Sequence, residues 1–415
     1  TSNDKVVAPP QLLSIDVAAF LAVIDFNQRS SPFSDSLSEL TQDCNFFLTM
    51  DFRDSAFSPV VAGREWLESF LFSKNTNQIR PMAVVGPLRS EFSGIVATLG
   101  SGAVATKDVV TGEKTLSSGS GGIPNISPTA RSARLDNTDE YPFFGRILPT
   151  NAGEAMALCI YLNSINVRQL AVLHVNDNYG IDFLAGVQNA ARQFGISVSH
   201  VSYNDGLDEP LTAVSRLEDK GYKYFFGIFS VGTAEKHVLR LYDQGLMTRP
   251  DIVWMFCETI YQSFGRKLLT NNTEEMKLAE ALNGTGVVKL HPPEREQDIL
   301  QQLLEDFRGD EALVENYLSR HLSGPLVGRD PISFLNDTFA PTPSGSGLMA
   351  YDAVMALGIG ACEIESDFFT GPELFESFKK VDFRGATGRV RFNTTTGTRD
   401  ESFLTCQIYS VIAEA

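Results

Sequence analysis

Clusters of basic residues are missing from this sequence. Its 415 residues include 34 lysines and arginines against 51 aspartates and glutamates, a formal net charge of -17, and no window gathers Lys and Arg. Proteins bind the phosphate backbones of nucleic acids through such clusters. Nucleic-acid binding is therefore excluded as a function class, and the acidic balance favours solubility.

Long apolar runs are also missing. A helix that crosses a bilayer needs about 20 consecutive, mostly apolar residues. The best candidates, residues 17–26 and 348–362, are shorter and carry Asp25 and Asp352. We therefore expect a water-soluble chain, with any membrane attachment supplied by segments outside it.

Catalytic signatures are the third absence. The 5 histidines show no H-E-x-x-H or other metal-ligand spacing, and no G-x-S-x-G nucleophile elbow occurs. Residues 112–115 only approach a phosphate-binding loop, because Glu113 interrupts the Gly-Lys-Thr step and the upstream glycine is missing. We expect neither an enzyme nor a bound cofactor.

Paired cysteine motifs are absent too, since the 5 cysteines are scattered without any C-x-x-C spacing. This excludes zinc ribbons and dithiol redox motifs. Cys362 with Cys406 is one candidate disulfide, although sequence alone does not establish pairing.

Glycosylation triplets are more frequent than chance, which gives a chain of this size about two. The candidate acceptors, each the first residue of an N-x-S/T triplet, are Asn271, Asn283, Asn336 and Asn393. A further triplet at Asn125 is weakened by Pro128. The excess favours a secreted protein.

What the sequence does contain is enough apolar material for two cores, with 43% hydrophobic and 20% charged residues. A chain of 415 residues is too long for one core, so we expect two large lobes. Helix and strand patterns alternate, which predicts parallel sheets flanked by helices, with ligands bound at the strands' carboxyl ends. Predicted strands cover 44–51, 81–85, 170–174, 196–203, 224–229 and 252–256, and predicted helices cover 61–73, 181–194 and 233–245.

Residues 123–155, IPNISPTARSARLDNTDEYPFFGRILPTNAGEA, are the most informative stretch. A short strand at 123–126 leads into a loop, 127–134, that offers hydroxyls, backbone N–H groups and two arginines. An aromatic-rich strand at 141–148 then ends at Pro149. The pattern predicts a carboxylate-holding loop followed by a crossover into the second lobe.

Five blocks along the chain carry a family resemblance. They are Ala83-Val84-Val85-Gly86-Pro87, residues 123–151, Asn178-Tyr179-Gly180, Ala350-Tyr351-Asp352-Ala353-Val354 and the F-x-G-x-x-G-x-V-x-F pattern of 383–392. In this order, they make nearly the whole chain resemble the type I periplasmic-binding-protein fold in its receptor ligand-binding, or Venus-flytrap, form. The nearest look-alikes are the extracellular domains of GABA type B and metabotropic glutamate class C G-protein-coupled receptors.

The resemblance implies an α/β protein of two Rossmann-like lobes, each with a parallel sheet flanked by helices, joined by a three-strand hinge. Lobe 1, which docks the ligand, would hold residues 1–148 and 260–397. Lobe 2, which closes, would hold 149–259 and 398–415. Dimerisation through lobe 1 is also implied.

Carried over by position, the resemblance assigns ligand contacts in both lobes. In lobe 1, Ser90 stands just before a helix where the family binds a carboxylate, and Thr129 and Arg131 fall in its second carboxylate-contacting loop. In lobe 2 the assigned residues are Asn151 at the ammonium position, Tyr179 as an aromatic contact, Ser230 as a contact of the GABA type and Glu258 in the second hinge.

Two of these residues depart from the family pattern. Arg131 replaces a small hydroxyl residue and Asn151 replaces an acid. A cationic head group would still find Glu258 and the ring face of Tyr179. Alternatively Arg131 pairs with Glu258, and an anionic ligand then suits the site as well as a zwitterion does.

The expected function is therefore the extracellular ligand-binding domain of a membrane receptor, which binds a small amino-acid-like or carboxylate ligand between its lobes and signals by hinge closure. One alternative is a soluble, periplasmic solute-binding protein of an amino-acid transporter. Another is a ligand-free partner subunit that acts through its dimer surface.

Overall fold

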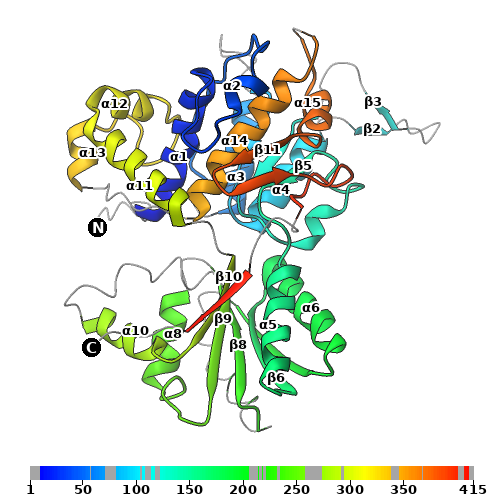
Figure 1. Cartoon of the computed structure of the whole chain (residues 1–415), viewed down its shortest axis with the longest axis vertical. Helices are drawn as coiled ribbons and strands as arrows, with labels where there is room; N and C mark the ends of the chain where they lie inside the picture. Colours follow the sequence, from blue (N-terminus) through cyan, green and yellow to red (C-terminus); the bar gives the residue numbers. More distant parts are fainter. Residues whose placement is uncertain are drawn as a thin grey trace. The chain divides into compact units, whose positions relative to one another are not determined.

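The chain forms two compact units in a computed structural model (Figure 1). Unit 1 comprises Thr1–Arg131, Leu135–Pro149 and Pro292–Phe403, and unit 2 comprises Ser132–Arg134, Thr150–His291 and Leu404–Ala415. The structure describes residues 10–56, 58–70, 81–102, 105–107, 114–116, 122–204, 214, 217, 221–230, 234–257, 273–290, 294–337, 345–366, 368–400 and 406–410.

Unit 2 is built on a six-stranded sheet with the order β13-β10-β9-β8-β6-β7. All neighbours are parallel except β13, which runs antiparallel to β10. All but the first residue of β6 are buried, as expected for a parallel strand covered on both faces. The strands are β6 (Gln169–Val175), β7 (Ser197–Tyr203), β8 (Tyr224–Ile228), β9 (Val253–Cys257), β10 (Gly286–Leu290) and β13 (Cys406–Ser410).

Helices cover both faces of this sheet. α5 (Ala152–Ser164) and α6 (Asn178–Gln193) lie on one side, and α8 (Ala234–Asp243) and α10 (Thr273–Leu282) lie on the other (Figure 1). Successive strand residues point to opposite faces, so Phe225 joins the core under α8 and α10 while Phe226 joins the core under α5 and α6. The alternation predicted for this half of the sequence is confirmed.

Unit 1 has a smaller parallel sheet, β1-β4-β5, within many helices. Its elements are α1 (Pro10–Asn27), α2 (Leu37–Leu40), α3 (Pro59–Phe70), β1 (Val84–Val85), α4 (Ser90–Gly102), β2 (Ala105–Lys107), β3 (Lys114–Leu116), β4 (Asn125–Ser127), β5 (Phe144–Arg146), α11 (Glu294–Gly309), α12 (Glu311–Ser319), α13 (Pro331–Asp337), α14 (Gly345–Cys362), α15 (Gly371–Phe378), β11 (Asp382–Gly385) and β12 (Gly388–Arg391). A short 3-10 helix at Ala133–Asp136 begins in unit 2 and ends in unit 1.

The central helix of unit 1 is α14, which packs along α1. It is long and apolar enough to cross a membrane, but 89% of it is buried inside the structure. The ring of Phe26 lies so close to Gly358 that a Cβ there would overlap it, so glycine permits this helix contact. α14 is accordingly the core helix of unit 1.

The strand expected at 44–51 does not form. Side chains take the backbone groups that a sheet would have used: Asn27 Nδ2 donates to Leu48 O at 2.9 Å, and Leu48 N donates to Asn27 Oδ1 at 2.8 Å. Arg29 donates to the carbonyl oxygens of Cys44 and Phe46 at 2.9 and 2.6 Å. Alternating apolar residues were therefore not enough to make a strand without a partner strand.

The boundary expected at residue 260 also differs. The described part of 260–291 belongs to unit 2, because β10 pairs with β9 on one side and β13 on the other. The described residues 398–400 belong to unit 1, where Thr398 bridges to Arg146 in β5.

The candidate disulfide between Cys362 and Cys406 is wrong. Cys362, the last residue of α14, bonds to Cys44, with Cα atoms 4.9 Å apart. Cys406 lies at the start of β13 in unit 2 and takes no part in this disulfide, and Cys159 and Cys257 are buried. Spacing along the sequence could not show that the end of α14 lies against the segment that follows α2.

A carboxyl group in α1 makes the stability of unit 1 dependent on pH. Burial, with a further contribution from Asp54, raises the pKa of Asp16 to about 7, against about 3.9 in an unfolded chain. Between these values the folded state holds a proton that the unfolded state has released. The free energy of unfolding should therefore fall by up to about 4 kcal/mol as pH rises from 4 to 7, and then level off.

Asp16→Asn should remove this contribution, and urea unfolding between pH 4.5 and 8.5 measures it. Glu315→Gln, an exposed substitution on α12, is the matched control and should keep the wild-type profile. The prediction fails if the Asp16→Asn and wild-type profiles stay parallel. Asp25, whose pKa burial raises to about 6, should add a smaller change of the same sign in both proteins.

Candidate functional site

In unit 1, two loops meet at the carboxyl edge of the sheet. One follows β1 and ends where α4 begins at Ser90, and the other follows β4, the parallel neighbour of β1. Thr129 Oγ1 donates to Leu88 O at 2.7 Å, and the backbone N–H of Arg131 donates to Ser90 Oγ at 3.1 Å. The structure therefore brings together Ser90, Thr129 and Arg131, the three residues assigned to lobe 1.

The same hydrogen bonds show what these polar groups do inside unit 1. Ser127 Oγ donates to Pro87 O at 2.6 Å, so hydroxyls join the two loops at successive positions. The Arg131 side chain is buried, and its Nε donates to Pro149 O at 3.3 Å. Each loop thus holds the other in place, which preorganises the backbone at this edge.

In unit 2, the carboxyl ends of β6, β8 and β9 also carry polar and aromatic side chains. Tyr179 lies in the first turn of α6, Ser230 follows β8, and Cys257 ends β9. The Tyr179 hydroxyl donates to Cys257 Sγ at 3.6 Å, and its ring meets Phe183 edge-on. Because the three strands are parallel neighbours, these residues share one edge of the sheet, where open α/β sheets bind ligands.

Asn151 is the most informative residue at the start of α5. Its side chain is 3% exposed, and neither Oδ1 nor Nδ2 has a hydrogen-bond partner among the described residues. It stands at the N-cap position but makes no side-chain cap. A buried polar group left unpaired costs about 1–3 kcal/mol, so native proteins keep very few of them.

The sequence did not reveal the role of Asp182. This residue of α6 accepts hydrogen bonds from the Ser132 hydroxyl and from the backbone N–H of Arg134. Asn178, one turn earlier on α6, accepts from Arg134 Nη1 at 3.2 Å. The spacing of four residues between Asn178 and Asp182 places them on one helix face and was the available signal.

The remaining assigned residues are Glu258 and the glycosylation candidates. Glu258 and Asn271 lie outside the described residues. Asn283, Asn336 and Asn393 are exposed, as glycan acceptors must be, and Asn125 is buried. Within the described ranges, no group of three His, Cys, Asp or Glu side chains could hold a metal ion.

Parallel sheets flanked by helices, with polar loops gathered at the strands' carboxyl ends, define a class of small-molecule-binding proteins, and a solved structure has the same fold. It is an ABC transporter substrate-binding protein from Desulfitobacterium hafniense in complex with Leu. The TM-score is 0.59 at 16% identity, covering 96% of this chain and 93% of that one. The chain therefore has the type I periplasmic-binding-protein fold.

The particular family follows from the sequence match. The chain belongs to the receptor family ligand binding region, which matches residues 45–403. A curated relative, metabotropic glutamate receptor-like protein E of Dictyostelium discoideum, is 22% identical over 311 residues, which cover 74% of this chain and 34% of the relative. The chain thus spans about a third of that receptor-like protein and is a ligand-binding domain of a typically non-enzymatic family.

Proposed function

We propose that this chain is the extracellular ligand-binding domain of a membrane receptor, that it binds a small amino-acid-like or carboxylate ligand, and that ligand binding closes a hinge. A ligand shifts a conformational equilibrium only by its difference in affinity for the two states. Contacts from both units would supply that difference.

The unpaired amide of Asn151 carries the proposal. Its Oδ1 accepts from an ammonium group and its Nδ2 donates to a carboxylate, so a zwitterion or a carboxylate would satisfy the buried side chain. The ring of Tyr179, at the carboxyl edge of the unit 2 sheet, would offer an aromatic face to a cationic head group. The solved relative of the same fold holds Leu, which supports an amino-acid-like ligand.

Asn151→Ala should weaken ligand binding by about tenfold to a hundredfold, because a hydrogen bond to a charged group contributes about 1.5–3 kcal/mol. Calorimetric titration with the common amino acids and small dicarboxylates measures the effect. The melting temperature without ligand should stay the same or rise, since alanine removes the unpaired buried amide. Gln193→Ala, exposed at the end of α6, is the matched control.

Two results would contradict the proposal. Loss of stability with unchanged affinity for a bound ligand would show that Asn151 has a packing role. No heat with any candidate would favour a ligand-free partner subunit, for which sedimentation should show dimers formed through unit 1.

A second candidate, a soluble solute-binding protein of a transporter, is favoured by the solved substrate-binding protein of the same fold. The Cys44–Cys362 disulfide suits both an extracellular and a periplasmic location, since both compartments are oxidising. Glycosidase treatment of protein isolated from its native cells separates the two candidates. The receptor would be favoured if glycosidase lowers the mass of the wild-type protein but not that of a variant with Asn283, Asn336 and Asn393 changed to glutamine.

A further inference from the structure

The hairpin β11–β12 of unit 1 carries an unusual group of charges for so acidic a chain. Asp382 and Arg384 on β11, and Arg389 and Arg391 on β12, are all exposed. The strands alternate between buried and exposed residues, so these four side chains share the outer face. One aspartate among three arginines leaves this face positive, although the whole chain has a net charge of -17.

Register places two of the arginines directly opposite each other. Arg384 pairs with Arg389 across the antiparallel ladder. Like charges in this position destabilise a hairpin unless another group neutralises them. Asp382 neutralises only one: its two carboxylate oxygens accept from Nε and Nη2 of Arg389 at 2.9 and 2.7 Å. Among the described residues, Arg384 has no ion-pair or hydrogen-bond partner.

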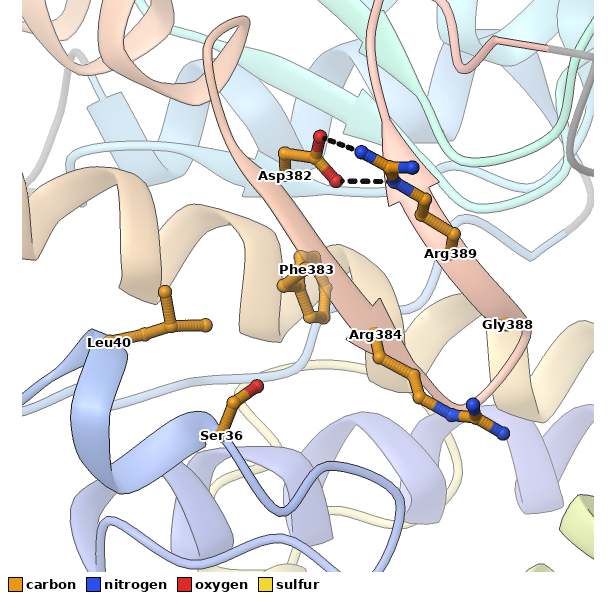
Figure 2. Close-up of a pocket in the computed structure, with 7 residues that line it drawn as sticks. All are labelled: Ser36, Leu40, Asp382, Phe383, Arg384, Gly388 and Arg389. Carbon is orange, nitrogen blue, oxygen red and sulfur yellow. Dashed lines mark hydrogen bonds and ion pairs between the residues drawn. The ribbon is translucent and has the colours of Figure 1, made fainter.

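A pocket of about 480 Å³ lies at this hairpin, within the range of small-ligand sites. Figure 2 shows Arg384 and Arg389 extending from opposite strands, with Ser36 and Leu40 facing β11 from the segment around α2. Leu40 provides apolar surface and Ser36 provides a hydroxyl donor, whereas Phe383 is only 5% exposed and points to the inner face of the hairpin. The lining thus combines a guanidinium without a partner, a hydroxyl, the apolar side chain of Leu40 and the ion-paired carboxylate of Asp382.

We propose that this pocket binds a small amphipathic anion, with an oxyanion head on Arg384 and a short apolar body against Leu40. Guanidinium groups bind both carboxylate and phosphate through paired hydrogen bonds, so either group could serve as the oxyanion head of the ligand. Asp382 in the lining is ion-paired with Arg389, and the exposed Asp35 and Glu39 adjoin Ser36 and Leu40 in the sequence. Negative charges farther away oppose binding only weakly, because salt at 0.15 M screens exposed charges beyond about 8 Å. The site is separate from the ligand position proposed above.

The experiment titrates the intact chain with hexanoate and hexyl phosphate at constant ionic strength and follows the Arg384 Nε–Hε resonance by NMR. Hexanol tests the need for charge, and acetate tests the need for the apolar body. Both hexyl anions should produce saturable shifts, and Arg384→Gln should weaken binding at least about tenfold, the loss expected for a charged hydrogen bond. Comparing the two anions identifies the preferred head group.

Arg391→Gln is the matched control, since it removes an exposed arginine from the same face but outside the pocket lining. It should change the affinity less than twofold, and Asn151→Ala should leave it unchanged. Equal losses in Arg384→Gln and Arg391→Gln would mean general attraction to a positive surface and would overturn the proposal. Equal binding of hexanol, or no saturable shift with either anion, would overturn it as well.

Discussion

Replacing Asp352 with alanine should lower the free energy of unfolding of unit 1 by about 3–5 kcal/mol, the cost of removing one partner from a buried ionic network. Asp352 is fully buried in α14 and Arg399 is 1% exposed. The carboxylate accepts from the backbone N–H groups of Ala386 and Thr387 at 2.7 and 2.9 Å. Alanine would leave both N–H groups unpaired and Arg399 without a counter-charge.

The hydroxyl of Thr387 links the two charges. It donates to Asp352 Oδ2 and accepts from Nη1 of Arg399, whose Nη2 donates to Arg389 O at 2.7 Å. Burial raises the pKa of Asp352, and Arg399 partly offsets this rise. Burial also lowers the pKa of Arg399 to about 10, with Asp352 opposing the change. The network therefore fixes the turn of the β11–β12 hairpin onto α14.

Unit 1 can be monitored selectively because the chain has 2 tryptophans, Trp66 in unit 1 and Trp254 in unit 2. In a Trp254→Phe background, urea unfolding followed by fluorescence reports on Trp66. Asp382→Asn is the control, since it changes an exposed ion pair on the same hairpin and should barely shift the midpoint. Asp352→Ala with Arg399→Met should cost less than the sum of the single changes. Additive losses would contradict a coupled network.

Most of unit 2 could be predicted from the sequence because its elements are long and locally consistent. β6 is mostly apolar, and Asp177 before α6 is a helix-capping residue whose side chain accepts from Gly180 N at 2.8 Å. The position of β10 could not be predicted. Its assignment to unit 2 depends on pairing with β9 and β13, and β13 follows β10 by more than a hundred residues.

The short elements of unit 1 were harder to predict from the sequence, because they depend on pairing with segments that are distant in the sequence. β1 has two residues and β4 three, so their periodicity carries little information. Turn residues and the family blocks, rather than alternation, located them. The segment 44–51 has the alternating pattern of a strand but does not form one. Its backbone groups bond instead to the side chains of Asn27 and Arg29.

The grouping of three candidate residues in unit 1 was predictable, but the hydrogen bonding of Asn151 was not. Loops after parallel strands share one edge, so the grouping of Ser90 with Thr129 and Arg131 followed from topology and resemblance. The sequence could not show that the Asn151 amide is buried and unpaired, because this depends on every residue packed around it. The pocket beside Arg384 likewise needed the cross-strand register.

Removing the Cys44–Cys362 disulfide should destabilise unit 1 by about 3–5 kcal/mol, because the bond closes a loop of 318 residues whose freedom returns in the unfolded chain. Cys362→Ser should lower the Trp66 unfolding midpoint under oxidising conditions. A thiol reductant should lower the wild-type midpoint to the same value and leave the variant unchanged. Cys406→Ser, which changes a cysteine outside this disulfide, is the matched control and should match wild type in both conditions. Peptide mapping without reduction should find Cys44 joined to Cys362, and a Cys362–Cys406 link would contradict the structure.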